Sequence, residues 1–290
     1  MDKATVKSFA KINPSLKING VRPDGYHELQ VSYLSVSLGD VLTFTPASDQ
    51  GISVTGLPEV PPAENLCRLA AEKLRGRATH PTGIHIHIEK RIPIGRGLGG
   101  GSGNAAATLA VLNELWNCDL SSQKLDQLAA ELGADVPFFL RGGYCKAAGV
   151  GDELHQEPNP YRDRLLGLLI PPFSLQTPKV YRRYDQLKNS ELSSRDIPAA
   201  AEKFSSDPSY LKNDLLKPAL SLRPELANFL NLPYNFPQVN KIGMSGSGSA
   251  VFVILQTDEA NLPQQFLEEL SRLDGKFELI RSTSRGFCHL

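Results

Sequence analysis

Between residues 93 and 104 the chain reads Pro93-Ile94-Gly95-Arg96-Gly97-Leu98-Gly99-Gly100-Gly101-Ser102-Gly103-Asn104. Six of the nine residues from 95 to 103 are glycine, which loses more conformational entropy on folding than any other residue. So high a density is expected where the backbone must approach a ligand closely. An alternating strand is predicted before the loop, over 83–92, and an alanine-rich helix after it, over about 104–116. A flexible linker would not lead into such a helix, so we interpret the segment as a binding loop.

Phosphate is the expected ligand, because the free N–H groups and the positive dipole end at the start of a helix attract anions. A Walker A loop is excluded, since no lysine follows any of these glycines. The spacing Gly95-x-Gly97-x-x-Gly100 matches the dinucleotide pattern, but the acid at the expected distance, Asp119, follows a helix instead of a strand. The H-R-D and D-F-G signatures of protein kinases are absent.

A second loop of small residues lies in the other half of the chain, Met244-Ser245-Gly246-Ser247-Gly248-Ser249, directly before a predicted strand over 250–255. A plain turn is the alternative interpretation. Two such loops about 150 residues apart, one in each half, favour a cleft between the halves with phosphate bound from both sides.

The remaining pattern predicts an α+β fold of two domains, 1–156 and 157–290, divided near Pro158-Asn159-Pro160. Further strands are predicted over 6–9, 16–18, 31–38, 41–44, 165–170 and 277–280, with a strand or hairpin over 144–154. Gly39-Asp40 is predicted to be a turn between two of them. Helices are predicted over 64–74, 121–132, 179–187, 224–232 and 263–273, and a loop with a short helix over 189–209.

Composition limits the class of protein. The 290 residues include 31 Lys and Arg against 31 Asp and Glu, and 41% are apolar. A neutral chain lacks the charge expected of a nucleic-acid or membrane-surface binder. The 4 cysteines form no C-x-x-C pair, so we expect reduced, mostly buried thiols and a cytoplasmic location, with no signal peptide and no membrane span. His85-x-His87 could hold a metal, but a solvated strand face is the favoured interpretation.

Other segments carry candidate chemistry with ordinary alternatives. Asp135 lies two residues before Pro137, so it could be a helix N-cap or a carboxylate that directs a hydroxyl. Lys11 interrupts an apolar strand, where a lysine usually extends to solvent. A Pro-Asp-Gly turn precedes Tyr26 and His27, which could be exposed rings or could stack on a base.

Together these segments resemble the GHMP kinase superfamily, whose members are small-molecule kinases with two α+β halves and an active-site cleft between them. The resemblance runs from end to end in family order, over Ala10-Lys11-Ile12-Asn13, 23–29, the glycine-rich loop with its Asn-Ala-Ala continuation, 132–137 and 245–248. Segment 24–29, Asp-Gly-Tyr-His-Glu-Leu, is similar to that of the branch acting on a cytidine-diphosphate derivative of methylerythritol in the non-mevalonate isoprenoid pathway.

The resemblance implies ATP-dependent phosphorylation of the C2 hydroxyl of that small molecule, with Mg²⁺ as cofactor. It implies Lys11 and Asp135 as the catalytic pair. Asn65 and the loop from Pro93 to Gly103 would bind ATP, with Ser102 as a ligand of the metal. The implied substrate-binding residues are Asn13, Tyr26, His27, Tyr181, Gly246 and Ser247.

Three residues depart from the family pattern: Pro14 replaces a usual Leu, Arg96 a small residue and Gly103 a Ser. Arg96 could add charge near the phosphates or point to solvent. Two alternatives stay open, a related kinase with another alcohol substrate and a non-catalytic nucleotide-binding regulator, which would be expected to lack Lys11 or Asp135. We expect a monomer or weak homodimer with no nucleic-acid or membrane partner.

Overall fold

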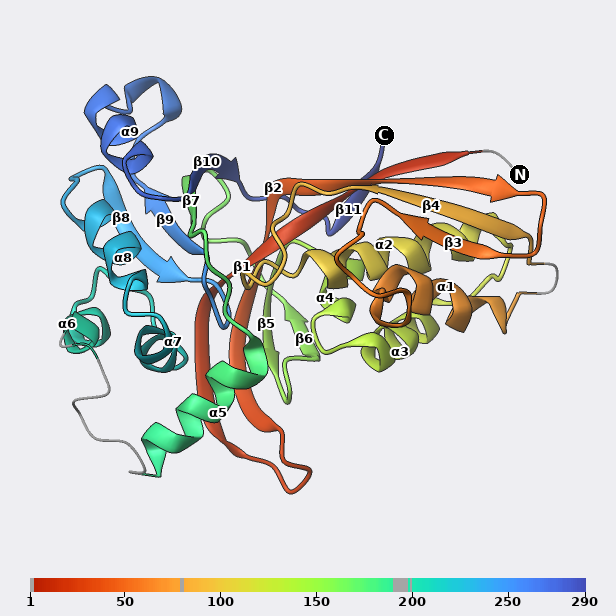
Figure 1. The fold of residues 1–290 in the computed structure, drawn as a ribbon, viewed down its shortest axis with the longest axis horizontal. Coiled ribbons are helices and arrows are strands. Elements are labelled where there is room, and N and C mark those ends of the chain that lie inside the picture. The colour runs from red at the N-terminus through yellow and green to blue at the C-terminus, as the bar shows by residue number, and fades with distance from the viewer. Residues whose placement is uncertain (1–2, 79–80, 190–197, 199) are drawn as a thin grey trace.

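A computed structural model describes residues 3–78, 81–189, 198 and 200–290, and it contains two sheets (Figure 1). The larger follows the order β11-β1-β2-β4-β3, and β5 and β6 extend it from β2. Its strands are β1 (Ala4–Val21), β2 (His27–Ala47), β3 (Ile52–Thr55), β4 (Gly83–Glu89), β5 (Tyr144–Ala148), β6 (Glu153–Gln156) and β11 (Phe287–His289). The smaller has the order β10-β7-β9-β8, formed by β7 (Leu165–Ile170), β8 (Val239–Met244), β9 (Val251–Leu255) and β10 (Lys276–Arg281).

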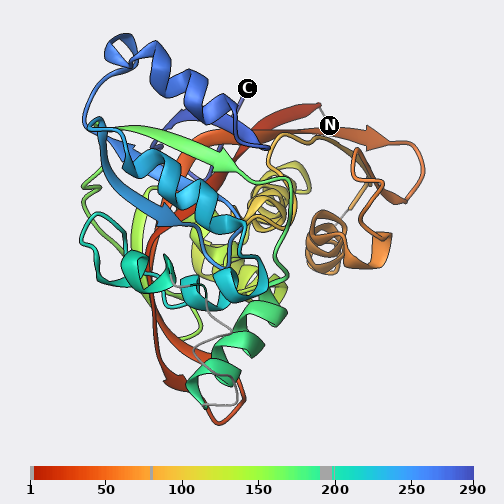
Figure 2. The ribbon, with the colours of Figure 1, turned by 60° about the vertical axis from the view of Figure 1, so that its left-hand side comes forward.

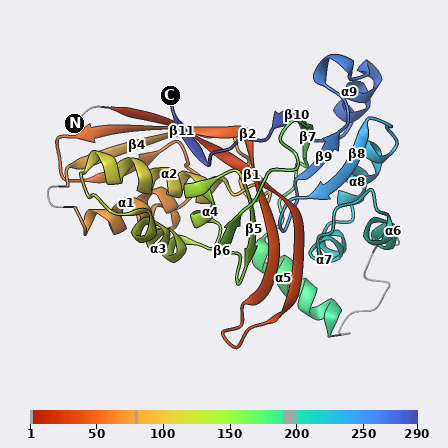
Figure 3. The ribbon, with the colours of Figure 1, turned by 180° about the vertical axis from the view of Figure 1, so that it is seen from behind.

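Helices cover each sheet and complete the expected α+β architecture. Four pack together beneath the larger sheet, α1 (Leu66–Arg75), α2 (Gly100–Leu115), α3 (Ser122–Leu132) and α4 (Val136–Arg141) (Figures 1 and 3). The smaller sheet is accompanied by α6 (Ala200–Ser206), α7 (Leu216–Leu222), α8 (Leu226–Tyr234) and α9 (Gln264–Ser271). Helix α5 (Thr177–Lys188) lies beside the far end of the β1–β2 ribbon (Figure 2). Among the described residues, the neighbouring strands pair antiparallel except β3 with β4.

The predicted turn at Gly39-Asp40 is wrong. Strand β2 continues through it, with Gly39 opposite Phe9 and Asp40 opposite Ser8. Local sequence favours a turn there. The Asp40 carboxylate, however, is fully buried and accepts hydrogen bonds from distant segments, so an aspartate is tolerated inside the strand. The β1 register shifts between Ile12 and Ser15. Pro14 lies within that irregularity, where the missing N–H is tolerated.

Other boundaries differ by a few residues from those predicted. Strands predicted over 6–9 and 16–18 are parts of the single strand β1, and those over 31–38 and 41–44 are parts of β2. Helix α2 begins at Gly100, earlier than predicted, and Gly99 precedes it as the N-cap in a left-handed conformation. Helix α7 was not predicted, and its sequence contains Pro218 within the first turn. Helix α6 is the short helix predicted within 189–209, of which residues 190–197 and 199 lie outside the described part of the chain.

The chain passes from the larger sheet to the smaller one and returns to the larger one at its last strand. Residues after 157 build the smaller sheet, but β11 returns to pair with β1, so the C-terminal strand belongs to the larger sheet. The division at 156/157 stays a prediction. All 4 cysteines are free, and two of them, Cys67 and Cys145, are buried. No helix in the described ranges is long and apolar enough to cross a membrane.

Candidate active site

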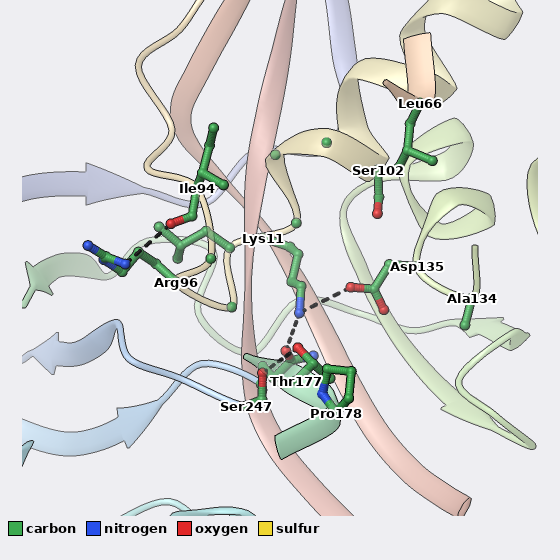
Figure 4. Close-up of a pocket in the computed structure, with 18 of the residues that line it drawn as sticks. Lys11, Leu66, Ile94, Arg96, Ser102, Ala134, Asp135, Thr177, Pro178 and Ser247 are labelled. Atoms are coloured by element: carbon green, nitrogen blue, oxygen red, sulfur yellow. Dashed lines mark hydrogen bonds and ion pairs between the residues drawn. The ribbon is translucent and has the colours of Figure 1, made fainter. Parts of the chain in front are cut away.

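Both small-residue loops line one cavity of about 930 Å³, within the usual range for small-molecule sites. Its wall includes every residue predicted for the site except Gly103, which is buried inside α2. The predicted cleft is confirmed in that residues of both halves, such as Asp135 and Ser247, share this wall (Figure 4).

The glycine-rich loop fits against both halves of the molecule. The carbonyl of Leu98 accepts the N–H of Lys11 at 3.0 Å, which attaches the loop to β1. Gly97 has a φ of +76°, and a Cβ there would lie 2.1 Å from the carbonyl oxygen of Ser245. The Ser245 hydroxyl also donates to the Gly97 carbonyl at 2.8 Å. The loops are therefore in direct contact, and glycine is required at 97 by both backbone conformation and space.

The N-terminus of α2 faces the cavity. Gly103 donates to Gly99 in the first helical hydrogen bond, so the N–H groups of residues 100–102 have no acceptor within the helix. Residues 100–102 line the cavity, and Ser102 is only half-buried there (Figure 4). A 16-residue helix with free donors at a cavity wall is a suitable site for phosphate.

Lys11 and Asp135 form an ion pair in the centre of the cavity wall, with 3.4 Å between Nζ and Oδ2 (Figure 4). The Lys11 side chain is only 5% exposed, so it does not extend to solvent. Its ammonium also donates to Oδ1 of Asn13 at 2.6 Å. Asp135 occupies the N-cap position of α4, but its side chain makes no cap hydrogen bond. The pair joins two segments that the sequence separates, and neither ordinary alternative holds.

Tyr33, which sequence reasoning missed, supports this pair. Its hydroxyl donates to Oδ1 of Asp135 at 3.0 Å, and the Lys11 ammonium lies 5.6 Å from the ring centroid. Burial raises the pKa of Tyr33 well above its ordinary value, and the nearby Asp135 charge raises it further. The hydroxyl therefore stays protonated as a donor. In the sequence Tyr33 is indistinguishable from an ordinary core aromatic of β2.

Asp40 organises the base of the loop. Its Oδ1 accepts the N–H groups of Arg91 and Ile92, at 2.7 and 2.8 Å. Its Oδ2 accepts Lys90 Nζ at 2.6 Å and Asn104 Nδ2 at 2.9 Å. Burial lowers the pKa of Lys90, and the Asp40 charge opposes that effect. One carboxylate thus joins the end of β4, the start of the loop and helix α2.

The far end of the cavity is aromatic. The predicted turn at Pro23-Asp24-Gly25 is confirmed, and it leaves the residue Tyr26 66% exposed. The His27 ring lies 4.8 Å from that of Tyr181, and its Nε2 is 2.8 Å from Oδ1 of Asp185. Burial raises the pKa of Tyr181, with a smaller effect from Asp135. Asp185 was not predicted, because no pattern within α5 distinguishes it.

The second loop reaches the ion pair from the other half. A Cβ on Gly246 would lie 3.3 Å from Lys11 Nζ. Asn213 holds the loop by donating to the carbonyls of Met244 and Gly246, at 2.9 and 2.8 Å. The Ser247 hydroxyl is 2.8 Å from that of Thr177. The interpretation of this segment as a plain turn is therefore insufficient.

Asn65 and the histidine pair have local roles. The Asn65 side chain caps α1 by accepting the N–H groups of Cys67 and Arg68, which fixes the residue at the cavity wall. His85 and His87 bond instead to hydroxyls of β3, those of Ser53 and Thr55. No cluster of three or more His, Cys, Asp or Glu residues suited to a metal occurs in the described part of the chain.

Comparison with known proteins defines the class. Residues 65–143 match the model of the GHMP kinases N-terminal domain. A solved homoserine kinase from Cytophaga hutchinsonii has the same fold, with a TM-score of 0.71 over 100% of this chain and 98% of that one at 17% identity. The chain thus has the fold of the GHMP kinases.

Relatives with higher sequence identity show which kinase family the chain belongs to. A kinase from Hahella chejuensis, 4-diphosphocytidyl-2-C-methyl-D-erythritol kinase, is 38% identical over 259 residues, which cover 86% of this chain and 83% of that protein. The crystal structure of a 4-(cytidine 5'-diphospho)-2C-methyl-D-erythritol kinase matches with a TM-score of 0.75 and 33% identity, over 95% of this chain and 97% of that one. The chain belongs to the family of 4-diphosphocytidyl-2-C-methyl-D-erythritol kinases.

Proposed function

We propose that this protein transfers the γ-phosphoryl group of ATP to the C2 hydroxyl of 4-diphosphocytidyl-2-C-methyl-D-erythritol, a step of the non-mevalonate isoprenoid pathway. The observation that carries the proposal is the Lys11–Asp135 ion pair. Both residues line the same cavity as the glycine-rich loop and Tyr26. Family membership supports the same activity.

Phosphoryl transfer depends mainly on positioning and charge stabilisation. Asp135 accepts or directs the proton of the attacking hydroxyl. Its Oδ1 is held by Tyr33 and its Oδ2 faces Lys11, so the carboxylate has a fixed orientation. The Lys11 ammonium stabilises negative charge that develops on the hydroxyl oxygen and on the transferred group. A positioned base of this kind contributes about 10²–10⁴ in rate.

The glycine-rich loop supplies the nucleotide site in this proposal. The N–H groups at the start of α2 bind the triphosphate, and Asn65 lies near the nucleoside. Mg²⁺ prefers oxygen ligands and keeps several waters when it is bound with phosphates. The half-buried Ser102 hydroxyl at the cavity wall fits such a ligand set. Bound there, the ion would neutralise phosphate charge.

The aromatic end of the cavity would hold the cytidine. Tyr26 offers an exposed side chain, and the contact between His27 and Tyr181 forms an aromatic wall. Asn13 and Gly246 lie beside the Lys11 ammonium, and Ser247 lines the same cavity; these three residues would bind the remainder of the acceptor.

Several finer expectations stay predictions. The N-terminal domain, 1–156, would carry the ATP loop and the catalytic pair, and the C-terminal domain, 157–290, the second loop. The partner is a small molecule, with no nucleic-acid or membrane partner. A cytoplasmic location and a monomer or weak homodimer are likewise predictions.

The test is a coupled assay of ADP release, with ATP, Mg²⁺ and the cytidine-containing acceptor present or absent. We expect ADP release that depends on this acceptor and exceeds that with mevalonate or homoserine at least a hundredfold. A preference for another alcohol would identify the related-kinase alternative. Nucleotide binding without any turnover would identify the regulator alternative, which the intact Lys11–Asp135 pair disfavours.

A further inference from the structure

Arg96 stands in the middle of the glycine-rich loop, but its guanidinium turns away from the ion pair (Figure 4). Nε donates to the carbonyl of Pro171 at 3.2 Å, and Nη2 to that of Pro172 at 3.0 Å. Nη1 donates to the carbonyl of Ile94, within the loop itself, at 3.3 Å. One side chain therefore spans the loop and the segment that follows β7.

Carbonyl oxygens surround this cation instead of a carboxylate. No ion pair involves Arg96 in the part of the chain that the structure describes. Partial burial lowers the pKa of its guanidinium. An arginine suits this position because its planar fork directs several donors at once in fixed directions, whereas an ammonium has no such fork.

Backbone contacts follow the same seam between the loop and the second half. Leu175 donates its N–H to the Gly95 carbonyl at 3.4 Å, and Ala250 donates to the Arg96 carbonyl at 3.1 Å. The Ser245 hydroxyl donates to the Gly97 carbonyl. The loop carbonyls are thus held by the second half, and Arg96 adds the side-chain part of this attachment.

We propose that Arg96 is a positioning residue that attaches the glycine-rich loop to the second half, so that the loop is already ordered before nucleotide binds. This inference rests on the nucleotide role of the loop in the proposed function. A loop with six glycines among nine residues has much backbone entropy to lose. An attachment that orders it in advance removes that cost from binding.

The effect is therefore expected in nucleotide affinity and not in the chemical step. Arg96→Ala is expected to raise KM for ATP and Kd for ADP about tenfold, which corresponds to about 1.4 kcal/mol. Its kcat should stay within threefold of wild type, and so should KM for the cytidine-containing acceptor. Arg96→Lys keeps the charge without the fork, so its affinity for nucleotide should also fall at least fivefold.

The experiment combines steady-state kinetics with calorimetric titration by ADP, on wild type, Arg96→Ala, Arg96→Lys and the control Arg91→Ala. Arg91 is an exposed arginine before the same loop, and among the described residues its hydrogen bond there is made by its backbone N–H and not by its side chain. Circular dichroism checks that each variant is folded. We expect the control to match wild type in both assays.

Two results would overturn the proposal that Arg96 orders the loop. One is wild-type Kd for ADP in folded Arg96→Ala. The other is full recovery in Arg96→Lys, which would mean that the charge acts directly on phosphate. If wild type turned over no cytidine-containing acceptor, the proposed function would fail, while the ADP titrations would still decide the role of Arg96.

Discussion

Replacement of Asp135 by Asn tests the catalytic pair most directly. The amide has nearly the same shape, and its Oδ1 can still accept the Tyr33 hydroxyl, now at 3.0 Å. The replacement removes the negative charge that lies 3.4 Å from the Lys11 ammonium. It also removes the carboxylate that could accept a proton from the attacking hydroxyl. The change therefore separates charge and basicity from packing.

The magnitude follows from the role of the carboxylate. Loss of a positioned base should lower kcat by about 10²–10⁴, which equals about 3–5 kcal/mol in the barrier. The cost in folding should be smaller, about 1–2 kcal/mol, and below the 3–5 kcal/mol of a fully buried pair. Two features reduce it: the Asp135 side chain is 32% exposed, and Asn13 still accepts a hydrogen bond from Lys11.

The assay is coupled ADP release at saturating concentrations of both substrates, with urea unfolding to measure stability. KM for ATP should change less than threefold, because Asp135 lies outside the glycine-rich loop. The control is Asp126→Asn, the same replacement at a carboxylate of α3 that pairs with Arg141 at 2.6 Å outside the cavity, and its kcat should equal that of wild type. A folded Asp135→Asn variant with kcat within fivefold of wild type would refute the reasoning.

Three further predictions concern other parts of the molecule. Tyr26→Ala should raise KM for the cytidine-containing acceptor roughly 5- to 150-fold but leave KM for ATP unchanged, and equal changes in the two KM values would contradict a stacking role. Asp40→Asn should lower the free energy of unfolding by about 3 kcal/mol, since it leaves the Lys90 ammonium facing an amide; a loss below about 1 kcal/mol in urea unfolding would disprove this. Burial raises the pKa of Cys67 to about 12 and of Cys145 to about 11. Both thiols should therefore resist iodoacetamide at pH 8 in the native protein. As the pH rises from 9 towards 11, alkylation should increase and the free energy of unfolding should fall, because the thiols ionise first in the unfolded state. Rapid labelling of either thiol at pH 8, seen by mass spectrometry, would show that it is accessible.

The glycine-rich loop and the helix after it were largely predictable because their signal is local. A dense glycine run between a strand and a helix has few structural solutions. Position 97 shows why, since its φ of +76° is a backbone conformation that favours glycine. Even so, the start of α2 was misplaced, because the glycines at 100 and 101 have low helix propensity and only the tertiary contacts around them stabilise the first turn.

The catalytic pair was predictable only in part. From local sequence, Asp135 could be a helix cap or a carboxylate that directs a hydroxyl, and a lysine at position 11 usually extends to solvent. The resemblance to a family implies that the two residues form a pair. The structure brings Lys11 of β1 within 3.4 Å of Asp135 at the start of α4. Tyr33 had no distinguishing signal, since a buried tyrosine in an apolar strand is usually core.

The sequence by itself determined where a dense run of glycines forms a loop between a strand and a helix, where most strands and helices lie, and to which superfamily the chain is similar. The loop, the strands and the helices depend on residues within a few positions of one another. Only the tertiary structure decided that Asp40 continues a strand, that Tyr33 holds Asp135 and that Arg96 attaches the loop to the second half. The physical reason is that a buried polar side chain needs a partner, and here the fold supplies that partner from a distant segment.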